Sequence, residues 1–346
     1  MDFTRSIPTD PTCLPEDTHL MPAFHKRPDW RILGLQPTDP EYALDRRRFL
    51  ASLGVGGLSL SGLIVGCKQT ADADAPPGRA TRPARPGLYP AKRNPSFTLD
   101  RKLTRRDAVL RHVNYYEFDA SNKPRAVQLA QKLVTHPWTI SVTGRVKKPK
   151  TFGVEELVGR LPLEERLYRH RCVETWAMAL PWTGFPLRRL LDLVEPLSSA
   201  KYVRFVSFNR PEQAPGMRAD SGYPWPYHEG LRMDEARNDL ALLATGMYGA
   251  PLSKQNGAPI RLVVPWKYGY KSIKAIVEIQ LVEKQPSTFW NTVNPREYGF
   301  ESNVNPAVPH PRWSQAEEWM IDGNRSVKRD TQAFNGYADL VAGLYS

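Results

Sequence analysis

The chain has 346 residues and a formal net charge of +12 at pH 7, and it is 41% hydrophobic and 24% charged. These proportions are typical of a folded globular protein, and they exclude a disordered chain, a collagen-like repeat and a polytopic membrane protein. The 32 prolines, about 9% of the chain against a usual 5% or so, predict long connections and short helices. The positive charge suits nucleic acid, acidic partners, an anionic membrane or a phosphorylated ligand, and composition alone does not choose among them.

An uncharged run over residues 51–66 follows the basic cluster Arg46–Arg48 near the N-terminus. The run is too short and too rich in Gly and Ser for a membrane-spanning helix, so it predicts a signal peptide. The pair Arg46-Arg47 resembles the twin-arginine signal, which exports proteins that are already folded. We therefore expect residues 1–67 to be a twin-arginine signal with a long N-terminal extension, and the protein to be periplasmic.

Two endings of this leader are open. The sequence Ile64-Val65-Gly66-Cys67 resembles a lipobox, which would place a lipid anchor on Cys67, whereas the small residues between 71 and 75 favour ordinary cleavage. Residues 68–95 have the Pro-rich, basic composition of an extended linker. The folded domain is expected to span residues 96–346.

Cysteine usage separates the leader from the rest of the chain. Cys13 and Cys67 lie in the leader region, so the exported part keeps only Cys172 and cannot form an internal disulfide. A single thiol in an oxidising compartment is either buried and inert or bound to another group.

Three roles for Cys172 can be weighed against its surroundings in the sequence. Zinc is disfavoured because the histidines after the leader do not have metal-binding spacing. Nucleophilic catalysis would need a base such as His170 or His228. A thiolate bound to a high-valent metal whose other ligands come from a cofactor needs no further protein ligand, and this option fits the count best.

The hydrophobic pattern predicts more strand than helix. Its strands and helices do not alternate as βαβ units, which favours an α+β fold with mixed sheets over a doubly wound parallel sheet. No dinucleotide-binding or P-loop motif occurs. In chain order, the predicted elements are a strand at 138–144, a short helix at 153–161, a strand at 167–173 that ends at Cys172, a helix at 185–194, and strands at 201–208, 241–248, 260–265 and 273–282.

Motifs spread over residues 95–346 resemble the sulfite-oxidase molybdopterin superfamily and, within it, the catalytic subunits of periplasmic protein-methionine-sulfoxide reductases. The segments that carry this resemblance are Asn114–Phe118, Leu161–Arg166, Arg171–Trp176, Pro181–Leu187, Gln255–Arg261, Pro265–Gly269, Asn305-Pro306, His310–Trp313 and Phe334–Tyr337.

The resemblance implies a molybdenum-molybdopterin cofactor whose metal is bound by the thiolate of Cys172. It implies a sulfite-oxidase-type domain without a separate dimerisation domain, in a monomer. Glu174 and Asn114 would be catalytic beside the metal. Glu174 lies two residues past the ligand, so on an extended segment it would share the face of Cys172.

The resemblance also implies which residues bind the pterin and its phosphate, a group that needs cationic and N–H donors. Ser207 stands where relatives often have Thr, and Val113 where they often have a second Asn. The cofactor-binding residues would be Asn114, Tyr116, Glu117, Ser207, Asn256, Arg261, Ser272, Ile273 and Lys274.

The implied reaction is the reduction of methionine sulfoxide in oxidised periplasmic proteins by oxygen-atom transfer at the molybdenum. The implied electron donor is a membrane haem b protein of the MsrQ type, fed by quinols, and the twin-arginine machinery would be a further partner. No nucleic-acid-binding motif occurs, and we do not expect the protein to bind nucleic acid. The alternatives are a sulfite oxidase or another S- or N-oxide reductase on the same cofactor and, less favoured, a non-catalytic anion-binding protein.

Overall fold

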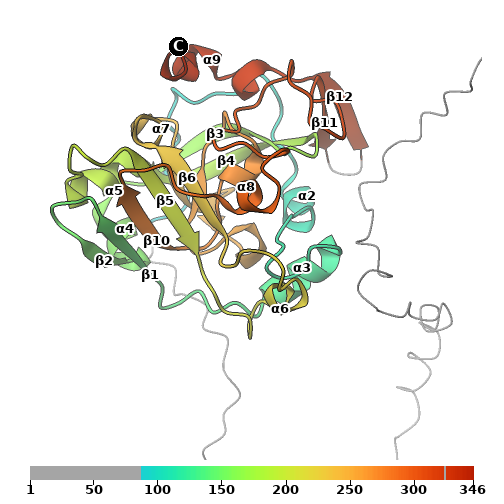
Figure 1. Ribbon diagram of the computed structural model, residues 1–346. Coiled ribbons are helices and arrows are strands. Elements are labelled where there is room, and N and C mark those ends of the chain that lie inside the picture. The colour runs from blue at the N-terminus through green and yellow to red at the C-terminus, as the bar shows by residue number, and fades with distance from the viewer. Residues whose placement is uncertain (1–86, 323–324) are drawn as a thin grey trace, which may run out of the picture. The chain divides into compact units, whose positions relative to one another are not determined.

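A computed structural model describes residues 87–322 and 325–346 (Figure 1). The predicted leader, the lipobox at Cys67 and the linker up to residue 86 lie outside these described residues. Within the described ranges, no helix is long and apolar enough to cross a membrane.

Two mixed sheets form the framework (Figure 1). In the smaller sheet, ordered β2-β1-β10-β5-β6, the central β1 and β10 are parallel and all other neighbours are antiparallel. Its strands are β1 (Thr139–Gly144), β2 (Lys150–Gly153), β5 (Tyr202–Ser207), β6 (His228–Arg232) and β10 (Ile276–Val282).

The larger sheet is ordered β12-β11-β4-β7-β8, with β3 paired to β4 and β9 paired to β7. The strand β4 is central because β3, β7 and β11 all pair with it. Its strands are β3 (Glu164–Arg171), β4 (Trp176–Pro186), β7 (Leu242–Met247), β8 (Ala250–Pro251), β9 (Arg261–Val263), β11 (Glu317–Asp322) and β12 (Arg325–Asp330).

The helices of the described residues are short, and the longest have eight residues. In α5 the buried residues Leu187, Leu190, Leu191 and Val194 recur at helical spacing, which fixes this helix on the core. The α-helices are α2 (Arg106–Arg111), α3 (Lys123–Ala130), α4 (Val154–Arg160), α5 (Leu187–Val194), α6 (Gly216–Ala219), α7 (Met233–Arg237), α8 (Phe289–Val293) and α9 (Ala338–Val341). Short 3-10 turns are η2 (Lys254–Asn256), η3 (Gly269–Lys271), η4 (Ala333–Gly336) and η5 (Ala342–Leu344).

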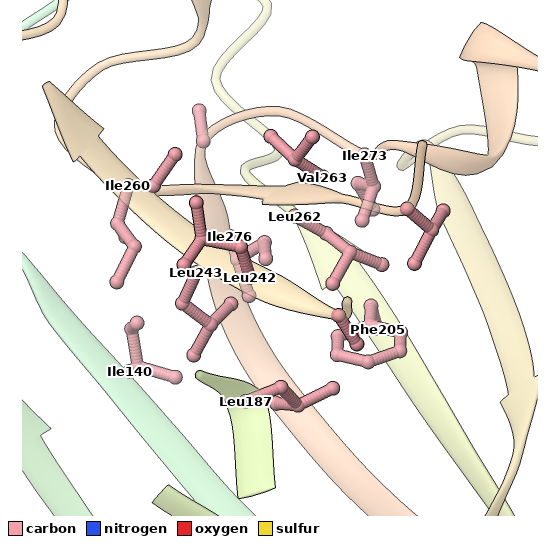
Figure 2. Packing of buried hydrophobic residues seen from close by; sticks show 14 of the residues in the cluster. Ile140, Leu187, Phe205, Leu242, Leu243, Ile260, Leu262, Val263, Ile273 and Ile276 are labelled. Atoms are coloured by element: carbon pink, nitrogen blue, oxygen red, sulfur yellow. The ribbon is translucent and has the colours of Figure 1, made fainter. Parts of the chain in front are cut away.

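One large apolar core joins the two sheets. Figure 2 shows Ile140 and Phe205 of the smaller sheet close to Leu242 and Leu243 of β7, with Leu187 of α5 beside them. All five side chains are fully buried. The core therefore holds the two sheets together and fixes the loops that leave them.

The α+β, mixed-sheet prediction is confirmed, and most predicted elements occur within a few residues of their expected bounds. Two predictions were wrong in detail. The strand expected over 273–282 begins only at Ile276, and the strand expected to end at Cys172 ends at Arg171. The structure also contains elements that were not predicted, among them β4, the longest strand, and the β11–β12 hairpin.

Candidate active site

Cys172 lies in a tight turn between the antiparallel strands β3 and β4. The Cys172 backbone N–H donates to Trp176 at 2.9 Å, and the Thr175 N–H donates back to Cys172 at 3.0 Å. Thr175 has a φ of 72°, which closes the turn. The extended segment expected around Cys172 is therefore wrong. Glu174 approaches the sulfur because the chain turns, and not because the two residues share a strand face.

The Cys172 sulfur is buried and has two polar neighbours. The Glu174 backbone N–H donates to Sγ at 3.4 Å, and the Asn114 amide Nδ2 lies 3.9 Å from Sγ. Burial and then the charge of Glu174 raise the pKa of the Cys172 thiol well above its usual value. The surroundings of Cys172 alone therefore do not favour a thiolate. A thiolate would form here if a bound metal replaced the proton.

The Glu174 carboxylate accepts hydrogen bonds beside the Cys172 sulfur. Its Oε2 accepts hydrogen bonds from Asn114 Nδ2 at 2.9 Å and from Trp176 Nε1 at 3.1 Å. The Lys123 ammonium lies 3.9 Å from the same oxygen. The structure thus brings Cys172, Glu174 and Asn114 together from two segments far apart in the sequence. It adds Trp176 and Lys123, whose contacts with Glu174 the sequence did not indicate.

Two histidines flank Trp176. The His112 ring lies 4.6 Å from the Trp176 ring, and burial with the nearby Lys123 charge lowers the pKa of His112 to about 4. Burial and then the Arg261 and Lys274 charges lower the pKa of His170 to about 3. No hydrogen bond joins His170 to Cys172 in the described part of the chain, and the His228 ring instead bonds the Pro226 carbonyl. These contacts give no support to a Cys–His nucleophile.

Arg171 fixes the backbone of the turn from inside the protein. Its guanidinium donates to the Cys172 carbonyl and, at 3.1 Å, to Thr331 Oγ1. Its Nε lies 3.3 Å from the buried Glu318 carboxylate, which also binds Arg101 at 2.9 Å. The hairpin β11–β12, which carries Glu318, therefore takes part in placing Cys172.

Two serine hydroxyls hold the segment before β10 in place. Ser207 Oγ donates to the Lys274 carbonyl at 2.8 Å, and Ser272 Oγ accepts from the Val264 N–H at 3.1 Å. The Ile273 side chain belongs to the apolar core (Figure 2). The side chains of Ser272 and Ile273 are therefore used inside the protein, and Ser207 supports the backbone of Lys274.

Arg261 is buried and Lys274 is half-buried, and neither forms an ion pair with a carboxylate of the described residues. Arg261 donates only to carbonyl oxygens, those of Asn256 at 3.0 Å, Ser272 at 2.8 Å and Leu262 at 3.3 Å. The Lys274 ammonium donates to the Asn114 carbonyl at 2.9 Å. Burial lowers the pKa of Arg261 to about 10, and burial with the Arg261 charge lowers the pKa of Lys274 to about 8.

Two other buried lysines show the contrast. Lys267 is paired with Glu235 at 2.6 Å and Lys271 with Glu229 at 2.7 Å. Within the described ranges, neither Arg261 nor Lys274 forms an ion pair with a carboxylate. The Glu117 carboxylate raises the pKa of Lys274 without forming an ion pair with it. Among the described residues two cations are thus balanced by one carboxylate, so the pair suits a bound anion such as a phosphate.

The backbone approaches these cations closely at Gly257. This residue has a φ of +101°. A Cβ added there would lie 3.0 Å from Cβ and Cγ of Lys274 and 3.2 Å from Cδ of Arg261. Nearby, the buried Tyr115 hydroxyl has no hydrogen-bond partner among the described residues, and Lys274 Nζ lies 4.7 Å from the Tyr115 ring. A glycine cradle, two unpaired cations and a free hydroxyl fit a phosphorylated cofactor.

The remaining predicted residues lie around this cradle. Asn256 uses its side chain locally, since Oδ1 accepts from Ser253 at 2.6 Å. The Tyr116 ring packs against Trp290 at 5.2 Å. Glu117 is buried, and burial raises its pKa while Lys274 opposes the shift. The described residues contain no cluster of three or more His, Cys, Asp or Glu side chains that could hold a metal.

Sequence reasoning missed several residues of this site. Arg171 and Gly257 lie inside recognised motifs, so their position was a usable signal. Lys123, His112 and Glu318 reach the site only through the fold, and no local pattern marks them.

Comparison with known proteins gives consistent results. Residues 127–290 match the family described as "Oxidoreductase molybdopterin binding domain". The protein-methionine-sulfoxide reductase catalytic subunit MsrP of Xanthomonas axonopodis pv. citri is 49% identical over 313 residues, which cover 89% of this chain and 93% of that protein. The protein of the same name from Burkholderia mallei is 49% identical over 87% of this chain and 88% of its own length. Among solved structures, the sulfane dehydrogenase SoxCD from Paracoccus pantotrophus has a TM-score of 0.38 and 20% identity, over 44% of this chain and 40% of that one.

Proposed function

Because the chain belongs to the family of protein-methionine-sulfoxide reductase catalytic subunits, we propose that Cys172 is the protein ligand of its molybdenum and that methionine sulfoxide is reduced there in periplasmic proteins. The predicted family, enzyme class and molybdenum-molybdopterin cofactor are confirmed by these relatives. Ligation by Cys172 is supported by the buried thiol at the turn, the one free cysteine of the described residues.

The cofactor supplies two electrons and the acceptor for the sulfoxide oxygen. The cationic residues Arg261 and Lys274, with the backbone at Gly257, would hold its phosphate, because neither cation forms an ion pair with a carboxylate of the described residues and both lie close to Gly257. Arg171 and the Glu174 N–H fix the position of the Cys172 sulfur. This is the observation that carries the proposal: a buried thiol and an anion cradle both lie against Asn114.

The reaction consumes protons as well as electrons, since a sulfoxide, two electrons and two protons give a thioether and water. Glu174 is the group placed to hold a proton beside the reacting sulfoxide oxygen. Its carboxylate is one quarter exposed, so it can exchange protons with solvent. Asn114 and Trp176 orient the carboxylate through their N–H groups.

The relatives are named catalytic subunits, which supports the existence of a partner protein. We propose that this partner is a membrane haem b electron donor of the MsrQ type. Export by the twin-arginine route rests on the motif at Arg46-Arg47, and a lipid anchor on Cys67 is the alternative ending of the leader. Cell fractionation of the wild type and of an Arg46→Lys, Arg47→Lys variant tests export. The variant should remain in the cytoplasm, and an equal periplasmic yield would contradict the route.

The activity is tested on the purified protein with a chemically reduced viologen dye as electron donor. We expect one molybdenum per chain, dye oxidation that depends on methionine sulfoxide, and methionine as the product detected by mass spectrometry. Sulfite with an electron-accepting dye is the matched assay for the alternative. Sulfite oxidation without sulfoxide reduction would replace the proposal, and a protein without molybdenum would favour the anion-binding alternative.

A further inference from the structure

Trp319 is an exposed aromatic side chain beside the Cys172 turn. Its exposed fraction is 41%. Every other aromatic residue whose burial is described, over 87–321 and 327–346, is buried or half-buried. Single exposed apolar residues are common on protein surfaces, so the place of Trp319 beside the active-site turn, and not its exposure alone, indicates a binding role.

The backbone of Trp319 is bonded to the active-site turn. Its N–H donates to the Thr175 carbonyl at 2.9 Å, and Thr175 is the residue between Glu174 and Trp176. In addition, Trp319 of β11 stands in parallel register with Trp176 of β4. Paired residues on neighbouring strands place their side chains on the same face of a sheet, so Trp319 shares the face of Trp176.

That face leads from the reacting groups to the edge of the larger sheet. Trp176 donates to Glu174 at one end, and Trp319 is paired in register with Lys328 of the edge strand β12. The Lys328 ammonium lies 5.9 Å from the Trp319 ring. Trp176, Trp319 and Lys328 thus form one row across three strands, which we call the tryptophan row.

Given the proposed function, on which this inference rests, we propose that the tryptophan row is the docking surface for the polypeptide that carries the oxidised methionine. A methionine sulfoxide side chain is short, so the backbone on either side of it must lie on the surface around Glu174. The row is continuous with Glu174 through the Trp176 hydrogen bond and the Thr175–Trp319 hydrogen bond. Its exposed indole offers a flat apolar contact. Lys328 flanks the indole, and its ammonium, which lies 2.5 Å from Glu317 Oε2, keeps further N–H donors for carbonyl groups of the bound chain.

Unlike Trp176, the side chains of Trp319 and Lys328 make no hydrogen bond or ring contact with Cys172, Glu174 or the phosphate cradle in the described ranges, so they should affect only substrates large enough to reach them. Free methionine sulfoxide lacks the flanking polypeptide that the row is proposed to bind. An oxidised protein or a peptide of about ten residues spans both Glu174 and Trp319, since an extended chain covers roughly 3.3 Å per residue. The difference between these substrates isolates the docking contact from the chemistry.

The test compares Trp319→Ala with the wild type as molybdenum-loaded enzymes, using reduced viologen as the electron donor. We expect the KM for an oxidised peptide or denatured oxidised protein to rise about tenfold, a loss equivalent to about 1.4 kcal/mol of binding free energy. For free methionine sulfoxide, kcat and KM should stay at the wild-type values. Leu340→Ala is the matched control, because Leu340 is also exposed but belongs to α9, and it should change neither substrate.

Several outcomes would overturn the proposal. Equal losses with both substrates would show that Trp319 supports the active-site turn, and Trp319→Phe would then restore both together. Unchanged kinetics with both substrates would remove the row from substrate binding. A defect seen only when the membrane electron donor replaces the dye would assign the surface to that donor. If the wild type reduced neither substrate, the proposed function itself would fail, and that result is distinct from all of these.

Discussion

Arg171 and Glu318 form a buried ion pair, with Arg171 Nε 3.3 Å from Glu318 Oε2, directly behind the turn that carries Cys172. Both side chains are almost fully excluded from solvent, and Glu318 is shared with Arg101. The pair joins the C-terminal hairpin to the residue before the proposed ligand. The position of the sulfur therefore depends on a strand about 145 residues away in the sequence.

Replacing Glu318 by Gln should leave Arg171 buried without an opposite charge, whereas Arg101 keeps its ion pair with Asp100 at 2.9 Å. We expect a loss of about 3 kcal/mol in the free energy of unfolding, measured by urea denaturation of the cofactor-free protein. The matched control is Glu156→Gln, because Glu156 forms an exposed pair with Lys150 at 2.8 Å. This control should change stability by less than about 1 kcal/mol. Equal effects of the two substitutions would show that burial of the Arg171–Glu318 pair is unimportant.

The unpaired cations of the phosphate cradle lead to an unusual prediction. Arg261→Met should destabilise the cofactor-free protein by less than Lys267→Met does, because three carbonyls lose a donor but no carboxylate of the described residues loses an ion-pair partner. It should nevertheless lower the amount of molybdopterin that purifies with the protein. Lys267→Met is the opposite control, since it strands the buried Glu235 and should cost about 3 kcal/mol. A large loss of stability in cofactor-free Arg261→Met, with normal cofactor content, would contradict the cradle.

Gly257 is expected to tolerate no side chain. Gly257→Ala forces a residue with a Cβ to a φ of +101° and pushes that Cβ to within 3.0 Å of Lys274. We expect a loss of about 1–2 kcal/mol in unfolding free energy and reduced cofactor content. Gly299→Ala serves as control, because nothing lies within 4 Å of a Cβ at that position. Matching thermal shifts for the two variants would argue against the close approach.

The stability of the cofactor-free protein should fall in mild acid partly because of His112. Burial and the Lys123 charge lower the pKa of His112 in the folded protein to about 4, from the 6.5 usual for histidine. Between pH 6.5 and 4 the unfolded chain therefore binds a proton that the folded chain does not, so stability decreases as the pH falls through this window. Allowing for the partial exposure of the ring, we expect roughly 1 kcal/mol between pH 7 and pH 5. Urea denaturation of His112→Gln at both pH values should show a smaller decrease than the wild type, and an identical decrease would exclude His112 as a source.

The fold class could be read from the sequence, but its longest strand could not. Strand β4 contains Pro181, Gly184 and Pro186, which normally interrupt strands, and its residues from Ala177 onward are buried on both faces. The alternation that reveals a half-buried strand is therefore missing. The hairpin β11–β12 was missed because it is rich in charged residues, a composition that is typical of a loop.

The site could be predicted to the extent that motifs mark it. Cys172, Glu174 and Asn114 come together in the structure as the resemblance implied, although a tight turn and not a strand face brings Glu174 to the sulfur. Contacts such as Lys123 with Glu174, or Glu318 with Arg171, join residues far apart in the chain. They depend on the packing of whole strands and helices, and no local pattern encodes them.

The most direct test of Cys172 as ligand is X-ray absorption at the molybdenum edge, on wild-type protein and on a Cys172→Ala variant loaded with cofactor. The wild-type spectrum should require one protein-derived sulfur in addition to the two dithiolene sulfurs of the pterin, and the variant spectrum should lack it. Identical sulfur coordination in the two proteins would contradict the assignment of Cys172.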